Sequence, residues 1–118
     1  MKQPDFNKLV KQLISNNAIE HMAAQMIILS MEENAVNPLA DVYYAGITDA
    51  EGVAILQTLA RIGGYEALAV LRNVFDFEEQ RPVLRNAAAW GLLHNKDKLS
   101  LEEYQEIARY FSEADENK

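Results

Sequence analysis

The sequence predicts an all-α protein, and three observations support this fold class. Apolar residues recur with the 3.6-residue period of a helix along nearly the whole chain. The breaks between these apolar stripes carry residues that begin and end helices, and no segment alternates with a period of two for long enough to form a strand. The chain has 118 residues, 49% apolar and 25% charged, which favours one globular domain with its own hydrophobic core.

The apolar pattern predicts seven helices, near residues 4–15, 18–32, 38–45, 49–62, 65–76, 82–94 and 100–112. The first carries one apolar stripe, formed by Phe6, Leu9, Val10, Leu13 and Ile14. The second is apolar around most of its circumference, and we therefore expect neighbouring helices to cover it on more than one side. Its apolar residues are Ile19, Met22, Ala23, Met26, Ile27, Ile28, Leu29 and Met31.

Capping residues mark the ends of the later helices. Asn37 followed by Pro38 predicts an N-cap and a proline at the first helical position, and Gly46 predicts a left-handed C-cap. Two further helix starts carry the capping-box pattern, at Thr48–Glu51 and Ser100–Glu103. Gly63-Gly64 separates two helices and Pro82 begins the next.

The chain also resembles itself at an offset of 33 positions, which predicts a repeated helical hairpin. The match continues through both helices of a pair. The superimposed pairs are Ala54 and Ala87, Leu59 and Leu92, Leu68 and Leu101, Leu71 and Tyr104, and Val74 and Ile107.

Two segments carry a resemblance to a known family. Leu59-Ala60-Arg61-Ile62-Gly63-Gly64-Tyr65-Glu66-Ala67-Leu68 resembles the hairpin junction of HEAT-like repeats, of the short bacterial type first recognised in phycobilisome lyases. Val83-Leu84-Arg85-Asn86-Ala87-Ala88-Ala89-Trp90-Gly91-Leu92 is similar to the first helix of that repeat. Two residues depart from the pattern: Gly52 stands where the repeat has arginine, and Gly91 replaces alanine.

The resemblance implies a short α-solenoid of about three HEAT-like helical hairpins, at 18–46, 49–76 and 82–112, in a single domain of residues 1–118. The helix at 4–15 would cap its N-terminal end, and residues 113–118 would form a frayed tail. The core residues that we expect to be buried are Leu56, Leu68, Leu71, Ala88 and Leu92.

The composition disfavours most kinds of chemistry, and we expect no enzyme, cofactor or metal. The chain has no cysteine, which excludes disulfides and thiolate sites. His21 and His94 are not followed by glutamate, so the iron site of the HEAT-like deoxyhypusine hydroxylases is not expected. HEAT-like DNA glycosylases have a basic concave face, which this acidic chain does not favour, and three hairpins offer little room for a bilin. A small HEAT-like accessory enzyme stays an alternative.

Charge and hydropathy bear on partners and location. The net charge of −7 disfavours binding to nucleic acid. The longest apolar run, Met26-Ile27-Ile28-Leu29, is far short of the ~20 residues that cross a membrane. The first residues lack the pattern of a signal peptide, and a cytoplasmic location is expected.

The implied repeat geometry predicts where a partner would bind. The second helix of each hairpin would line the concave side, and its outward residues would form an acidic surface with two tyrosines. We call this surface the acidic ridge: Asp41, Tyr44, Glu66, Asn73, Glu106 and Tyr110. Tyrosine is frequent at interface hot spots, and acids select basic partners. We therefore predict a non-catalytic interaction module, scaffold or adaptor that binds a basic protein or peptide. The alternative is a self-associating structural protein. We expect the chain to be a monomer or a weak homodimer.

Overall fold

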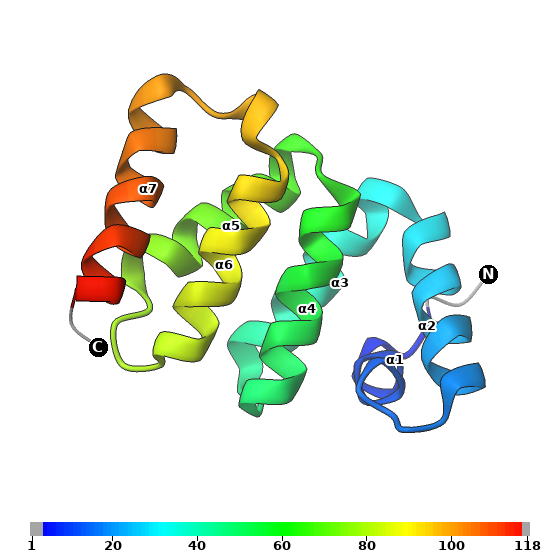
Figure 1. The fold of residues 1–118 in the computed structure, drawn as a ribbon. Coiled ribbons are helices and arrows are strands. Elements are labelled where there is room, and N and C mark those ends of the chain that lie inside the picture. Colours follow the sequence, from blue (N-terminus) through cyan, green and yellow to red (C-terminus); the bar gives the residue numbers. More distant parts are fainter. Residues whose placement is uncertain (1–3, 117–118) are drawn as a thin grey trace.

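Helices account for 83% of residues 4–116, the part of the chain that the computed structural model describes, with side chains to residue 113. No strand occurs in this range, which confirms the all-α prediction. Two 3₁₀ helices, Glu32–Ala35 and Lys96–Lys98, accompany seven α-helices in this range (Figure 1). The α-helices are α1 Phe6–Leu13, α2 Ala18–Ser30, α3 Val36–Ala45, α4 Asp49–Ile62, α5 Tyr65–Phe77, α6 Pro82–His94 and α7 Leu101–Glu116.

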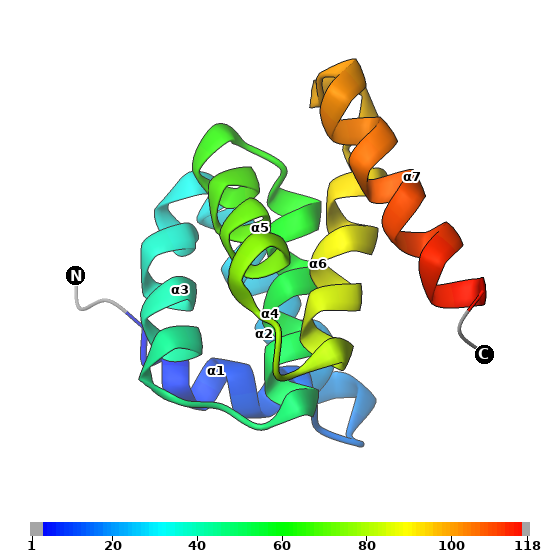
Figure 2. The same ribbon diagram turned by 90° about the vertical axis from the view of Figure 1, so that its left-hand side faces the viewer.

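The helices are arranged in two layers along the long axis of a molecule of 46 × 28 × 25 Å. Figure 1 shows α4 and α6 side by side in the nearer layer, with α2 at one end and α7 at the other. Helices α3 and α5 lie behind them, and the turned view in Figure 2 separates the two layers. Helix α4 contacts α5 and α6, and α5 also packs against α6, so these three helices form the centre of the fold.

The core lies between the two layers, where the expected residues are buried. Helix α4 contributes Ile55, Leu56 and Leu59, each with no exposed surface, because these positions follow one another along its inner face. The remaining predicted core residues, all at most 3% exposed, are Leu68, Leu71, Ala88 and Leu92.

Both predicted capping boxes are present. The Thr48 hydroxyl accepts from the amide of Glu51 over 3.2 Å, and the Glu51 carboxylate accepts from the Thr48 amide over 3.0 Å. At the start of α7, Ser100 and Glu103 make the same reciprocal pair over 3.1 and 3.3 Å. Gly63 ends α4 in the left-handed region, at φ 68° and ψ 7°. These local signals define where α4 begins and ends, and where α7 begins.

The predicted start of α3 is wrong. The helix begins at Val36, directly after the 3₁₀ turn Glu32–Ala35, so Asn37 does not cap it and Pro38 is its third residue. Proline is tolerated there because the first four amides of a helix have no partner within the helix. Gly46 ends α3 as expected, with positive φ (113°) but with ψ of 121°, outside the left-handed helical region.

The last helix is longer than predicted. Helix α7 continues to Glu116 instead of ending near 112, because no proline or glycine interrupts the helix-forming residues that follow Phe111. Most of the expected frayed tail is therefore helical. Its last two residues, 117 and 118, lie outside the described residues, as do residues 1–3.

The expectation that α2 is covered on several sides is also wrong. Only Ala24 and Ile28 of this helix are buried. Helices α1 and α4 pack on one side of α2, and no described element lies on its outer side because α2 is at the end of the layer (Figure 1). Five apolar residues therefore face solvent, and we call them the outer stripe: Ile19, Met22, Ala23, Met26 and Ile27.

Candidate functional site

A groove of about 680 Å³ lies on the α2, α4 and α6 side of the molecule. We call it the front groove. Its apolar lining includes Val83 and Trp90 on α6, which are 51% and 63% exposed. The other lining residues are Leu13, His21, Gln25, Val53, Ala54, Gln57, Thr58, Ala60, Arg61, Asn86, Ala87, Gly91 and His94.

Helical spacing explains how α6 builds one wall of the groove. Val83, Ala87 and Trp90 are four and then three residues apart, so they share a face of α6. The opposite face of the helix carries the buried Ala88 and Leu92. One helix thus places small residues in the core and leaves a tryptophan in the groove.

Helix α4 builds the facing wall by the same spacing. Val53, Gln57 and Arg61 are four residues apart and line the groove together, while Leu56 and Leu59 point into the core. On the other side of α4, His21 and Gln25 of α2 line the groove, and small residues such as Ala54 and Gly91 complete its lining. The groove therefore extends over α4, from α6 toward α2.

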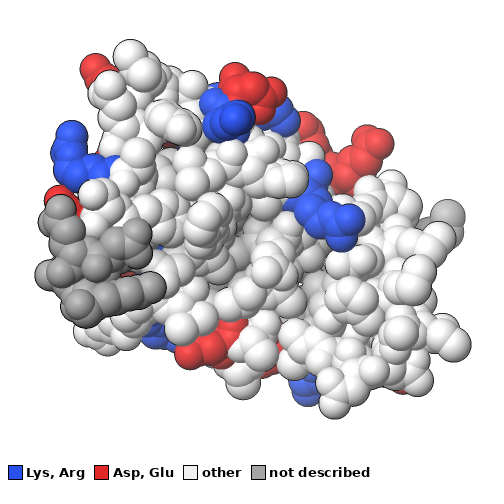
Figure 3. Space-filling model, viewed as in Figure 1, with Lys and Arg blue, Asp and Glu red and all other residues white. Residues whose placement is uncertain are grey.

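The groove has the opposite electrostatic character from the rest of the protein. Its lining contains no aspartate or glutamate, although the chain carries a net charge of −7. Its ionisable side chains are Arg61 and two histidines, His21 and His94. Figure 3 views this face: uncharged residues cover its centre, and most charged ones lie toward its edges.

The ring of His21 is held at one end of the groove. Its Nδ1 lies 2.6 Å from the carbonyl oxygen of Leu13, at the end of α1. A carbonyl can only accept, so Nδ1 carries the proton and Nε2 is the acceptor in the neutral ring. His21 thereby fixes the turn between α1 and α2 and gives the groove a polar side chain of defined orientation.

Aromatic packing attaches α7 to the wall that α6 forms. The rings of Trp90 and Phe111 lie 4.6 Å apart between centroids, at an interplanar angle of 42°. The Tyr110 hydroxyl donates to the side-chain oxygen of Asn86, another residue of the groove lining. The guanidinium of Arg85 lies over the Tyr110 ring at 4.7 Å. The orientation of α7 is thus linked to two residues of the groove.

The acidic ridge, whose residues lie on α3, α5 and α7, is only partly assembled. The Nδ2 of Asn73 donates to the Tyr44 hydroxyl over 2.6 Å, so α5 and α3 bring these two residues together as expected. Asp41, Glu66 and Glu106 are exposed.

Tyr110 has contacts outside the ridge. Its ring packs edge-on against the buried Phe75, 5.2 Å between centroids, and its hydroxyl binds α6. Arg72 also introduces a positive charge between α5 and α7, since its Nε lies 2.6 Å from the Glu103 carboxylate. The pKa of Glu103 is lowered, chiefly by this hydrogen bond. The ridge is therefore less uniformly acidic than its six residues suggest.

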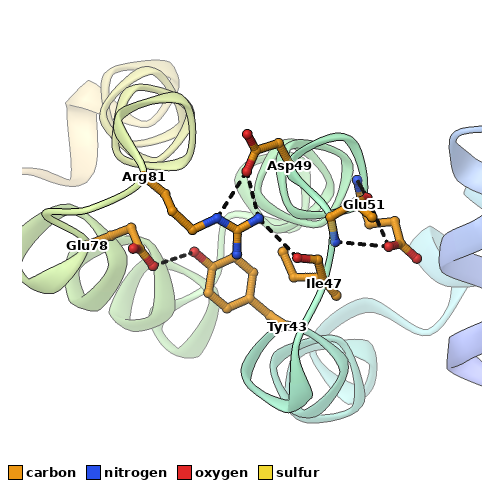
Figure 4. A network of polar contacts seen from close by, with 7 residues as sticks. Tyr43, Ile47, Asp49, Glu51, Glu78 and Arg81 are labelled. Atoms are coloured by element: carbon orange, nitrogen blue, oxygen red, sulfur yellow. Dashed lines mark hydrogen bonds and ion pairs between the residues drawn. The ribbon is translucent and has the colours of Figure 1, made fainter.

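A polar network joins the loops at one end of the layers (Figure 4). Arg81 donates to the Asp49 carboxylate over 2.6 and 3.0 Å and to the carbonyl of Ile47 over 3.0 Å. The Tyr43 hydroxyl points to Glu78, 3.4 Å away. Burial, and secondly the charge of Glu78, raise the pKa of Tyr43 to about 12. Tyr43 is thus neutral at physiological pH, and the network holds the α3–α4 and α5–α6 loops together.

Two other features that would indicate a function are absent from the part of the chain that the structure describes. No group of three histidine, aspartate or glutamate side chains there could hold a metal ion. No helix in that part is long and apolar enough to cross a membrane.

Comparisons of the chain with models of protein families, with curated proteins and with solved structures find no match. The front groove is therefore the feature from which a function can be argued.

Proposed function

We propose that this chain is a non-catalytic protein-binding module that takes an amphipathic helix of a partner protein into the front groove. The observation that carries the proposal is an apolar groove, free of carboxylates, in a strongly acidic protein. Trp90 stands in this groove with 63% of its surface exposed. Tryptophan is among the residues most enriched at interface hot spots, where it anchors a partner.

The shape of the groove supports a helical partner. Helices α4 and α6 run side by side, and the lining of the groove over them includes small residues, Ala54 and Gly91 among them. A helix can lay its apolar face into such a groove, with side chains at i, i+3, i+4 and i+7 between the two walls. An extended strand would need a strand edge to pair with, and the described residues contain no strand.

Charge supports an acidic or neutral partner in this groove. Arg61 and His94 belong to the last turns of α4 and α6, so both lie where these two helices end. An incoming helix that runs antiparallel to α4 and α6 would place its N-terminal turn there. First turns commonly carry aspartate or glutamate, which the helix dipole favours. Arg61 would then lie near a carboxylate of the bound helix. This ion pair would fix the direction of that helix and would raise the association rate more than the affinity.

A basic partner on the acidic ridge is the second candidate. The hydrogen bond between Tyr44 and Asn73 supports it, because it orders two of the predicted contact residues on one surface. The proposed HEAT-like repeat architecture accommodates either surface, since solenoids of this kind act as protein-binding scaffolds. The two candidates differ in the charge of the partner and in the face that it covers.

The test is selection of peptides from a displayed library of amphipathic helices of about five turns. We expect the selected peptides to carry an acidic residue near the N-terminus of an apolar face. Trp90 is the single tryptophan of the chain, so its fluorescence reports on the groove directly. Binding should shift its emission to shorter wavelength because a bound helix removes water from the indole.

Gln57 offers a matched pair of variants, since it is exposed and lines the groove. Gln57→Glu keeps the shape and adds a negative charge, and should slow association of the acidic peptides. Gln57→Lys should accelerate it. Tyr44→Ala, on the acidic ridge, should leave binding unchanged. Selected peptides that are basic, and that lose binding with Tyr44→Ala but not with Gln57→Glu, would assign the partner to the ridge instead.

A further inference from the structure

The outer stripe on α2 is the most apolar exposed surface among the described helices. Ile19 is 80% exposed, Met26 69%, Met22 59% and Ile27 42%. With the exposed Ala23 these residues form an arc on the side of α2 opposite its buried residues. A helix that is apolar around most of its circumference is normally covered on more than one side, and the chain covers α2 on one side only.

The size of the stripe limits what could cover it. Four large side chains with 42% to 80% exposure, together with Ala23, present on the order of 500 Å² of apolar surface. This is about the size of the largest apolar patch of a typical monomer, and such patches are often functional. Two such surfaces facing each other bury about 1,000 Å² in total, at the lower limit for a specific interface. The stripe therefore suits a pairing that forms and dissociates, rather than a permanent assembly.

The charge distribution favours a second copy of the same chain. Two copies with a net charge of −7 each repel one another over most of their surfaces. Glu20 is the single acidic residue of α2, which has no lysine or arginine, so here two copies can approach with little repulsion. A twofold interface requires a surface that is complementary to itself. An uncharged apolar arc meets that requirement.

The order of residues along α2 also favours an antiparallel pair. Ala23 lies midway between Ile19 and Ile27. A twofold axis at Ala23 brings Ile19 of one copy against Met26 and Ile27 of the other. The small side chain at the centre lets the two helices approach closely, and the flexible methionines can fill the space on either side.

We propose that two copies of this chain form a reversible dimer through antiparallel contact of their outer stripes. The interface is separate from the front groove, since the stripe lies on the outer side of α2, whereas His21 and Gln25 line the groove. The dimer therefore leaves both grooves accessible. It also supplies the neighbour that α2 lacks within one chain.

The first experiment measures mass by sedimentation over a range of protein concentrations. We expect a monomer–dimer equilibrium in the micromolar range. Met26→Glu should raise the dissociation constant at least tenfold, because the twofold axis places one carboxylate from each copy in the apolar interface. The matched control is Phe77→Glu, which changes charge equally at a residue that is 76% exposed on α5. Its dissociation constant should equal that of the unchanged protein.

The second experiment tests the position of the axis. The chain has no cysteine, so Ala23→Cys introduces a single thiol. Under mild oxidation it should form a covalent dimer, whereas Ser112→Cys, exposed on α7, should not at the same concentration. A chain that stays monomeric at several hundred micromolar, or a dimer unaffected by Met26→Glu, overturns the proposal. Binding of monomers to phosphatidylcholine vesicles, lost in Met26→Glu, would assign the stripe to a lipid surface and overturn it as well.

Discussion

The side-chain amide of Asn95 donates a hydrogen bond to the carbonyl oxygen of Ala60, over 3.0 Å, and so joins the C-terminal ends of two neighbouring helices. The same nitrogen lies 3.0 Å from the carbonyl oxygen of Gly91. Both carbonyls are in last turns, where a helix leaves four oxygens without partners of its own. Asn95 is 6% exposed, so water replaces these bonds poorly. One buried amide therefore caps both α4 and α6.

Replacement of Asn95 should destabilise the protein according to the chemistry of the new side chain. Asn95→Ala should lower the free energy of unfolding by about 1–3 kcal/mol, because two buried carbonyls lose their donor. Asn95→Asp should lower it further, since a carboxylate would face two carbonyl oxygens. Urea titration measures both. Lys96→Ala, at an exposed neighbour, serves as the control, and equal stability of all three variants would contradict this capping role.

Leu71 is the core position where truncation should be most costly. It has no exposed surface, and its two methyl groups lie above Gly91, each 3.2 Å from where a β-carbon would stand. Leu71→Ala should lower the free energy of unfolding by about 2–5 kcal/mol, because it leaves a cavity between α5 and α6. Thermal and chemical denaturation would both report it. Phe77→Ala, at an exposed position of α5, should change stability by less than about 0.5 kcal/mol.

Enlarging Ala88 should also destabilise the fold. Ala88 is fully buried on α6, so the added atoms of Ala88→Leu would force neighbouring helices apart. The expected loss is about 1–3 kcal/mol, despite the higher apolar content of leucine. Ala69→Leu makes the same change at an exposed position of α5 and should be nearly neutral. A neutral Ala88→Leu would show that the core can expand at this point.

The raised pKa of Tyr43 predicts a loss of stability in alkali. The folded state keeps the phenol protonated up to about pH 12, whereas an unfolded tyrosine loses its proton near 10. Above pH 10 the unfolded chain thus binds fewer protons, and the contribution of Tyr43 is lost between pH 10 and 12. Tyr43→Phe should remove on the order of 1–2 kcal/mol of this pH dependence. Urea titrations of both proteins at pH 9 and 11.5 measure the free energy of unfolding. If both lose the same free energy between these pH values, Tyr43 is not the source of the pH dependence.

Much of the helical structure could be predicted from local chemistry. The predicted bounds of the helices at 49–62 and 82–94 agree with α4 and α6, because a capping box and Gly63 bound the first and Pro82 begins the second. These signals act within a few residues, so one sequence contains them in full. The start of α3 could not be predicted in this way, because a 3₁₀ turn without a side-chain cap precedes it.

Whether other elements cover the apolar faces of a helix depends on the whole fold, and the prediction from sequence was wrong for α2. The pattern shows that Met22 and Met26 share an apolar face, but it cannot show whether any other element reaches that face. The structure buries Ile28 and leaves both methionines exposed. A surface intended for another molecule has the same periodicity as a core, so the two are distinguished only once the neighbours are known.

The sequence does contain a pattern that indicates the front groove, but the expected repeat geometry points to other helices. Val83, Ala87 and Trp90 share one helical face, opposite Ala88, and a tryptophan on the face away from the core indicates a surface role. The implied repeat geometry instead predicts the binding side on the second helices, α3, α5 and α7. Trp90 and Gln57 line the same groove because α4 packs on α6, and no local pattern encodes that packing.

Helix α7 is held to the rest of the molecule by few buried groups. Among its described side chains only Ile107 is fully buried, while Tyr110 and Phe111 are half-buried. Segments with so little buried surface open at a lower free energy than the whole protein unfolds. Amide hydrogens of α7 should therefore exchange with solvent earlier than those of α4. Each such opening would also free Trp90 from Phe111 and Asn86 from Tyr110. Fluctuations of the last helix are thus transmitted to the width of the groove beside it.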